Sequence, residues 1–344
     1  MSESNTTAST QSVVIGWIGS VLVRLIVPAW ILFGALQKAM GGTPKSLPRS
    51  ILDAGSTLGI SDHFLLLTTL ISIEFFFVAF MLFSARLAKR AGIFMLGAFL
   101  VVLCVEMFGY GNFESCGCFG EKSLSPMAMF AIDFALFLGI IFIPTRQGKR
   151  PLTHENRSLI LVFTFTILAT FFTFTTVMGQ KPSETTFTDN PTLPPLPASW
   201  YPQNIGSWID KPVDEIPLFG WVKEWPIDIQ EGKQYVIFYS LTCDHCEALL
   251  WEHFEFPAFS TTLVAIPQST DGFNYDGAFE NPCQDCQLAE LRVGADWIIG
   301  APLVVALENG IVKCAAENEE YEAPACLIHY IQSLRKLKRI SMPL

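Results

Sequence analysis

The stretch YSLTCDHCEALLW, residues 239–251, decides how the carboxyl-terminal half of this chain folds. The segment YVIFYSL (235–241) is rich in β-branched and aromatic residues and predicts a short buried strand, and from Asp244 onward the pattern becomes helical. Cys243 and Cys246 therefore fall where a strand gives way to a helix. A pair with this spacing could be a redox couple, or it could supply half of a tetrahedral zinc site.

Strand and helix patterns alternate through the rest of this half. The expected elements are a strand at 261–267, a helix at 288–294, a hairpin at 301–314 that turns at 308–310, and a final helix at 325–337. This order is typical of an α/β domain, which we expect over residues 210–340. Residues 180–209 are rich in Pro and Thr and are expected to form an extended tether in front of it.

Further cysteines occupy the same half. Cys283 and Cys286 repeat the CxxC spacing and could close an extra disulfide or act as a second redox pair. Cys314 and Cys326 are expected to form a structural disulfide between the last strand and the last helix. A zinc site built from both CxxC pairs is an alternative, but more than thirty residues separate Cys246 from Cys283, whereas compact zinc ribbons use about 15–20.

Five apolar stretches dominate the amino-terminal half. The whole chain is 51% hydrophobic and only 16% charged, which is too apolar for an ordinary soluble protein. About 20 apolar residues cross a bilayer as a helix. The stretches are residues 13–36, 63–84, 91–111, 124–144 and 158–178. We expect a tail at 1–12, a four-helix membrane bundle over 13–145, and a loop with a fifth anchoring helix over 146–179.

Basic residues collect in two of the short loops between these stretches. They are Arg86, Lys89 and Arg90 in one loop and Arg146, Lys149, Arg150 and Arg157 in the other. By the positive-inside rule both loops are expected to face the cytoplasm. With five spans, the amino terminus then lies inside and everything after residue 179 lies outside the inner membrane, where thiols can be held oxidised.

The charge of the two halves differs in sign. Residues 1–179 hold 12 Lys and Arg against 9 Asp and Glu, whereas residues 180–344 hold 10 against 23. Binding to nucleic acid requires a basic face, so the acidic half argues against a nucleic-acid partner. The expected partners are the lipid bilayer and an exported protein that carries thiols or disulfides.

The segment NFESCGCFGEKSLSP (112–126) adds a second cysteine pair on the expected outer side. Cys116 and Cys118 are separated only by Gly117, and a disulfide between them would close a small strained ring that is easily reduced. The alternative is that one or both cysteines form structural bonds with other cysteines.

Four of the expected spans contain an ionisable residue. These are Arg24, Glu74, Glu106 and Asp133. Charges in hydrocarbon are unfavourable, so such residues usually face the bundle interior and pair with one another. Arg24 is expected to pair with Glu74 or Asp133. The group could form a quinone pocket or a proton path, or it could simply fix how the helices pack.

The stretch around Cys243 resembles the thioredoxin superfamily, and GAPLVVALENG (300–310) carries Pro302 where that family has a cis-proline. The resemblance implies that Cys243, at the amino end of a helix, attacks a disulfide, and that Cys246 resolves the mixed disulfide. His245 would favour the thiolate of Cys243. The chain departs from the family by lacking a tryptophan before Cys243 and by carrying an insertion at 272–286.

The membrane half resembles the MauE family of methylamine-utilisation proteins, which is related to DoxX-like four-helix proteins. The matching features are CGCFG (116–120), Ser125 and Pro126 opening the next span, and RLIVPAWILFGALQK (24–38) in the first. The resemblance implies a role in maturation of a disulfide-rich methylamine dehydrogenase subunit, alongside a thioredoxin-like partner that is fused here.

The sequence therefore predicts a membrane-anchored thiol–disulfide oxidoreductase in which Cys243 and Cys246 exchange electrons with Cys116 and Cys118. The alternatives are a non-catalytic membrane assembly factor whose disulfides are structural and an outer module that binds zinc.

Overall fold

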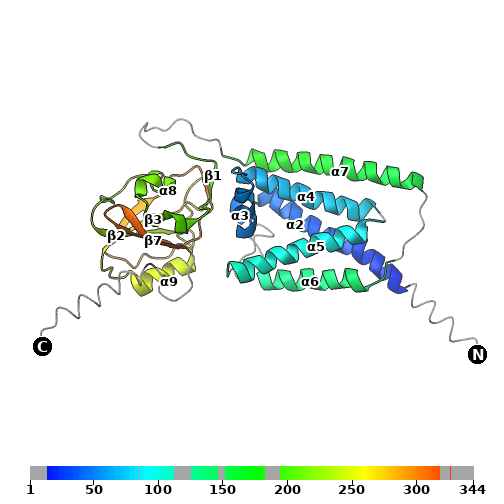
Figure 1. The fold of residues 1–344 in the computed structure, drawn as a ribbon, viewed down its shortest axis with the longest axis horizontal. Coiled ribbons are helices and arrows are strands. Elements are labelled where there is room, and N and C mark those ends of the chain that lie inside the picture. The colour runs from blue at the N-terminus through cyan, green and yellow to red at the C-terminus, as the bar shows by residue number, and fades with distance from the viewer. Residues whose placement is uncertain are drawn as a thin grey trace, which may run out of the picture. The chain divides into compact units, whose positions relative to one another are not determined.

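The computed structural model describes residues 14–84, 86–111, 125–145, 152–182 and 194–317, together with Cys326. The chain divides into two compact units, Met1–Lys181 and Pro182–Leu344 (Figure 1). The expected tail at 1–12 and the Cys116–Cys118 pair lie outside the described residues, as does the final helix expected at 325–337 apart from Cys326.

The first unit is a bundle of apolar helices that lie side by side (Figure 1). It contains η1 (Leu22–Ile26), α2 (Val27–Gly41), α3 (Arg49–Thr57), α4 (His63–Phe83), α5 (Ala88–Cys104), η3 (Val105–Gly109), α6 (Pro126–Phe142) and α7 (Leu152–Gly179). Among the described helices, four are long and apolar enough to cross a membrane: Val14–Gly41, His63–Phe83, Ala88–Gly109 and Arg157–Gly179. These confirm four of the five expected spans and identify a membrane protein.

The remaining expected span is the shorter helix α6, with 17 residues. At 1.5 Å per residue it is about 25 Å long, which is the lower limit for crossing the hydrocarbon core. Its amino end is well defined, because Pro126 occupies the first turn and the Ser125 side chain accepts a hydrogen bond from the Ala128 amide.

The bundle packs closely at small residues and leaves many large apolar side chains on its outside. Gly92 on α5 allows close approach, since a Cβ there would lie 3.0 Å from Ile140 Cδ1 on α6 and 3.3 Å from Met81 Sδ on α4. Phe94 and Phe171 are 63% and 68% exposed. In water such rings would be buried, so their outward position fits a lipid-facing surface.

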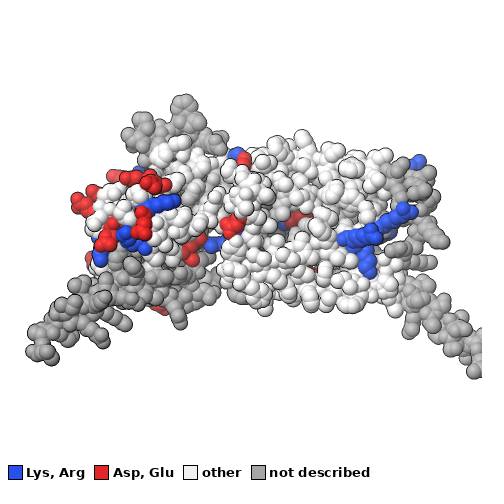
Figure 2. Space-filling view, in the orientation of Figure 1, with Lys and Arg blue, Asp and Glu red and all other residues white. Residues whose placement is uncertain are grey.

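Charge is almost absent from the middle of this unit's visible surface, and Lys and Arg collect at one end (Figure 2). The basic residues Arg86, Lys89 and Arg90 lie at the start of α5, and Lys89 Nζ donates a hydrogen bond to the Ile141 carbonyl at the end of α6. The visible surface of the bundle therefore has one basic end (Figure 2).

The second unit is built on a five-stranded mixed sheet in the order β4-β3-β2-β6-β7. Its strands are β2 (Lys233–Tyr239), β3 (Ser260–Ala265), β4 (Gln287–Glu290), β6 (Leu303–Glu308) and β7 (Ile311–Glu317). Strands β2, β3 and β4 run parallel, and β6 and β7 run antiparallel to their neighbours. Helix α9 (Asp244–His253) connects β2 to β3. The α/β class, the first two strands, this helix and the hairpin are as predicted.

The prediction of a helix at 288–294 is wrong, because residues 287–290 form strand β4. Leu288 pairs with Leu263 of β3 in parallel register. The local sequence QLAELRV favours a helix by propensity, but the exposed backbone edge of β3 offers a full set of hydrogen-bond partners. Long-range pairing therefore decides the structure of this segment.

Strand β2 lies in the middle of the sheet, and every residue of it after Lys233 is buried. Because successive side chains point to opposite faces, the strand contributes to two cores. Val236 and Phe238 join a core that contains Trp221 and Trp297. Ile237 and its neighbours on the other face pack in a second core with the helix α9. All six described disulfide cysteines belong to or contact this second core.

Packed structure begins earlier than expected. Residues 180–209 are predicted to be an extended tether, but β1 (Ser199–Trp200) pairs in parallel with β5 (Asp296–Trp297), and Leu196 is buried. The Trp200 ring packs against Trp208, Trp221 and Trp297 at centroid distances of 5.6–6.4 Å. Large aromatic contacts of this kind anchor residues 194–209 to the domain despite their prolines.

We expect Phe238→Ala to lower the free energy of unfolding of this domain by about 3–5 kcal/mol, because the fully buried ring packs edge to face on Phe219 at 5.8 Å. The change is measurable by denaturant unfolding of the full chain in detergent, followed by the fluorescence of the core tryptophans. The matched control Leu288→Ala removes a side chain that is 61% exposed and should change stability by less than about 0.5 kcal/mol. Equal losses in the two variants would contradict the assignment of this core.

Candidate functional site at the amino end of helix α9

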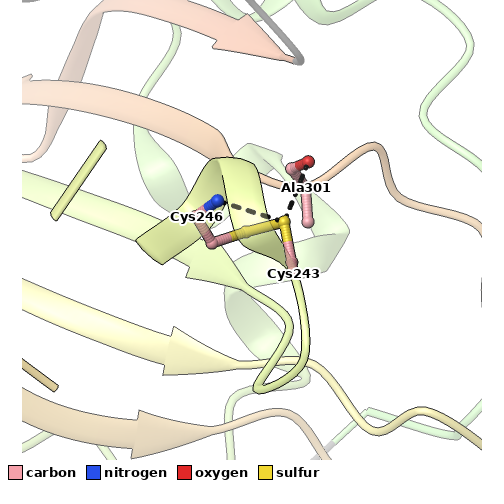
Figure 3. Close-up of a disulfide and its surroundings, with 3 residues drawn as sticks. All are labelled: Cys243, Cys246 and Ala301. Atoms are coloured by element: carbon pink, nitrogen blue, oxygen red, sulfur yellow. Dashed lines mark hydrogen bonds between the residues drawn. A yellow bond between two sulfur atoms is a disulfide. The ribbon is translucent and has the colours of Figure 1, made fainter. Parts of the chain in front are cut away.

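Cys243 lies at the point where β2 has ended and α9 begins. The Cys243 amide donates to the Ser240 carbonyl at 3.2 Å, which closes a tight turn after the strand. Cys243 is the N-cap residue of α9, and its Sγ accepts a hydrogen bond from the Cys246 amide at 3.1 Å (Figure 3). The sulfur thus takes the place of a capping oxygen and faces the unpaired amides and positive end of the helix dipole.

The two sulfurs of the pair have very different exposure. Cys243 and Cys246 form a disulfide with a Cα–Cα distance of 5.2 Å (Figure 3). Cys246 is completely buried in the second core, whereas Cys243 is half-buried and packs at its margin. An incoming thiolate can therefore reach Cys243 and not Cys246. This asymmetry divides the pair into one accessible sulfur and one shielded sulfur.

The loop before β6 supplies the other wall of the site. Cys243 Sγ lies 3.6 Å from the Ala301 carbonyl oxygen (Figure 3). The Ala301–Pro302 peptide bond is cis, as predicted for Pro302. The amide of Gly300 donates to the Glu317 carboxylate at the end of β7, which ties this loop to the neighbouring strand. Glu317 and the Ala301 carbonyl are absent from the sequence-based site, because no local pattern reports a contact across the sheet.

The residues between the two cysteines are charged or ionisable. Asp244 is exposed and His245 is half-buried in the first turn of α9, and Glu247 follows Cys246. Acidic side chains stabilise a helix amino terminus. The same charges oppose a thiolate at Cys243, whereas the backbone amides and the helix dipole favour it.

The other cysteines close disulfides of their own. Cys283 bonds to Cys286 and Cys314 bonds to Cys326, with Cα–Cα distances of 5.5 Å and 5.2 Å. The second of these is the predicted structural bond. Each CxxC pair is closed on itself, and the described residues contain no group of three or more His, Cys, Asp or Glu that could hold a metal ion. Cys104 in the bundle is a free thiol.

A groove of about 420 Å³ opens at the carboxyl ends of the parallel strands. It is lined by Lys223, Glu224, Tyr239, Leu241, Ala265, Phe273, Tyr275, Leu288, Ala289 and Glu290. Leu241 is two residues before Cys243, and its carbonyl accepts a hydrogen bond from the Phe279 amide at 3.1 Å. Burial raises the pKa of Tyr239, and the nearby Glu290 and Tyr275 raise it further, so its phenol stays protonated at neutral pH. Aromatic side chains thus lie beside the cysteine loop.

The two mid-bundle carboxylates contact residues that the sequence did not suggest as partners. Glu74 pairs with Lys38, and Asp133 accepts a hydrogen bond from the Trp30 indole at 2.8 Å. Lys38 lies two residues beyond the first apolar stretch at 13–36, but α2 continues to Gly41 and buries it. The partner that the sequence suggested for these carboxylates, Arg24, lies fourteen residues before Lys38 in the π-helical turn η1. Glu106 is also buried, and its Oε1 accepts the Ser50 amide at 2.7 Å.

Comparison of the chain with protein-family models, with curated proteins and with solved structures gave no match. The chemistry of the site is therefore argued from its own geometry.

After mild reduction, we expect iodoacetamide to modify Cys243 at least about tenfold faster than Cys246, because Cys246 reacts only when the core opens locally. Mass spectrometry of the peptide that contains both cysteines, with successive light and heavy reagents, measures the two rates. In the control, 6 M guanidinium should equalise them. Equal rates in the folded protein would contradict the difference in exposure.

Proposed function

We propose that this membrane protein is a thiol–disulfide oxidoreductase that acts through Cys243 and Cys246. The observation that carries the proposal is the half-exposed Cys243 Sγ, which caps helix α9 while its bonded partner Cys246 is fully buried. A structural disulfide gains nothing from having one sulfur accessible at a helix amino terminus. A catalytic one needs both an entry point and a shielded leaving group.

The arrangement around the pair supports a thioredoxin-like interpretation. The cysteines follow the central strand β2, the parallel strand β3 comes after the helix, and Pro302 precedes the antiparallel strand β6 within reach of Cys243. This resembles the thioredoxin superfamily in strand order and in the place of its cis-proline. The segment between β3 and β6 differs, since it carries β4 and the Cys283–Cys286 disulfide.

In the proposed reaction a client thiolate attacks Cys243 Sγ. The Cys243–Cys246 bond breaks, a mixed disulfide forms, and Cys246 leaves as a thiolate that takes up a proton. The second client thiolate then attacks the client sulfur of the mixed disulfide, so that the client becomes a disulfide and the enzyme pair a dithiol. Two electrons pass from client to enzyme. The same steps in reverse reduce a client disulfide.

The membrane half would serve as the second electron carrier. In this proposal Cys116 and Cys118 exchange disulfide for dithiol with Cys243 and Cys246, which returns the catalytic pair to its starting state. The basic start of α5 supports placing that end of the bundle in the cytoplasm and the α/β domain outside the inner membrane. An exported protein rich in disulfides, such as a methylamine dehydrogenase subunit, is the client that the MauE resemblance suggests.

We expect Cys246→Ser to trap a mixed disulfide between Cys243 and its client. In this variant the Cys243 thiolate can still attack a client disulfide, as in the reverse direction, but the Cys246 thiol that would release the client is missing. Cells that express the full chain are quenched with acid and alkylated, and the adduct appears on a non-reducing gel and vanishes with dithiothreitol. The double variant Cys243→Ser/Cys246→Ser should form none. The matched control Cys283→Ser/Cys286→Ser/Cys246→Ser should still trap the client. If Cys243→Ser left the oxidation state of the client unchanged, the protein would be a non-catalytic scaffold instead.

We expect Cys243 and the Cys116–Cys118 pair to face the same compartment. Two variants are made, one that keeps only Cys243 and one that keeps only Cys116 and Cys118. After reduction, a membrane-impermeant maleimide should label both variants in intact spheroplasts. The internal control is a cysteine placed at Arg90, which should label only after the membrane is opened. Labelling of the two pairs from opposite faces would exclude electron exchange between them.

A further inference from the structure

A small cavity of about 40 Å³ lies between helices of the bundle. It is lined by Trp30, Ile31, Gly34 and Lys38 of α2, Glu74 of α4, Phe99 of α5, and Met129 and Asp133 of α6. Four helices thus meet around it. Lys38, Glu74 and Asp133 are the ionisable residues in this lining, and all three are buried.

Two polar pairs face the cavity. Lys38 Nζ pairs with Glu74 Oε1, and Lys38 also lies 5.9 Å from the centre of the Phe99 ring. Trp30 Nε1 donates to Asp133 Oδ1 at 2.8 Å. The second carboxylate oxygen of Glu74, Oε2, is buried without a hydrogen-bond partner among the described residues. A buried acceptor of this kind normally has a partner, and a cavity lies next to it.

The volume of the cavity selects its occupant. A water molecule needs about 10–15 Å³, so one or a few waters fit. Pockets that hold a small organic molecule measure at least about 300 Å³, and a quinone ring is therefore too large for this space. Water has both the size and the hydrogen-bond donors to satisfy Glu74 Oε2 and to reach the Asp133 pair.

The charges of the lining require a proton. Lys38 carries one positive charge, whereas Glu74 and Asp133 carry two negative charges when both are ionised. A net charge in a buried, low-dielectric site within a membrane is strongly unfavourable. One proton on the two carboxyl groups makes the cluster neutral.

We propose that this cavity is a hydrated proton-binding site, in which one exchangeable proton is held by Glu74 or Asp133 and water links the two. The site belongs to the bundle alone and does not depend on the redox activity proposed for Cys243. Of the two roles that the sequence suggested for these residues, a quinone pocket and a proton path, the proposal favours the proton path. It also assigns a role to Lys38, whose charge sets how many protons the cluster binds.

Infrared spectroscopy of the full chain in lipid nanodiscs tests the count of protons. At neutral pH the wild type should show a carbonyl band from a protonated carboxyl group that shifts in D₂O. Glu74→Gln and Asp133→Asn should each lose that band, because one carboxylate then balances Lys38. Lys38→Met should increase its area about twofold, since both carboxyl groups must be neutral without the cation.

Two comparisons keep this test independent of misfolding. The double variant Lys38→Met/Glu74→Gln has neither the cation nor the Glu74 carboxyl group. Its band should return from the doubled area of Lys38→Met to the area of the wild type, because only Asp133 carries a protonated carboxyl group in the cluster. The exposed control Glu252→Gln should leave the spectrum unchanged, and any band from the buried Glu106 is present in every variant and cancels in the differences. Absence of the band in the wild type, or the same spectrum in all three single variants, would overturn the proposal. So would a stoichiometric quinone that copurifies with the wild type and is lost in Asp133→Asn.

Discussion

The structure of the α/β domain depends on the burial of strand β2 on both faces. Neither face of this central strand is exposed to solvent. Its alternate side chains pack into two separate apolar cores, one on each face of the sheet. The pairing of β2 with β3 and β6 then fixes where the strand ends, and Cys243 follows at that edge. The position of the sulfur is thus a consequence of the sheet, and the Cys246 amide completes it by donating to Sγ.

The same core that supports the sheet shields half of the cysteine pair. Cys246 packs with Leu249 and Leu250 of α9, while Cys243 stays at the margin beside the Ala301 carbonyl. Any reaction at this disulfide therefore begins at one sulfur, and the other leaves into a space from which water is excluded. The groove beside Leu241 is lined by Tyr239 and Tyr275, so an aromatic surface begins two residues before the accessible sulfur of Cys243.

In the bundle, large apolar side chains lie on the outside as well as in the interior, because lipid and protein interior are equally apolar. Phe94 and Phe171 face outward, while Phe64 and Ile71 are buried together with polar pairs. Lys38 pairs with Glu74, and Trp30 pairs with Asp133, around a small cavity within the bundle. Unbalanced charge in a buried cluster of this kind would destabilise the bundle. The number of protons that the cluster binds is therefore tied to the stability of the fold.

Local patterns in the sequence were sufficient for the features that depend on neighbours along the chain. Apolar length determined four membrane helices, β-branched and aromatic runs determined strands β2, β3 and the hairpin, and the spacing of Cys243 and Cys246 marked the candidate site. The cis bond before Pro302 was expected from a family resemblance instead, because local preference favours the trans isomer. For the helices and strands, the energetic preference of the segment and its final structure agree.

Tertiary structure decided the features that depend on residues far apart in the sequence. Residues 287–290 became a strand because the edge of β3 was available, and Trp200 was drawn into the aromatic core although it lies in a Pro-rich stretch. Lys38 pairs with Glu74 because α2 continues past the first apolar stretch to Gly41 and brings the lysine into the bundle beside α4. Pairings of this kind, including Glu317 with the loop before Pro302, arise only when the packed elements meet, since their energy comes from contacts that no local window contains.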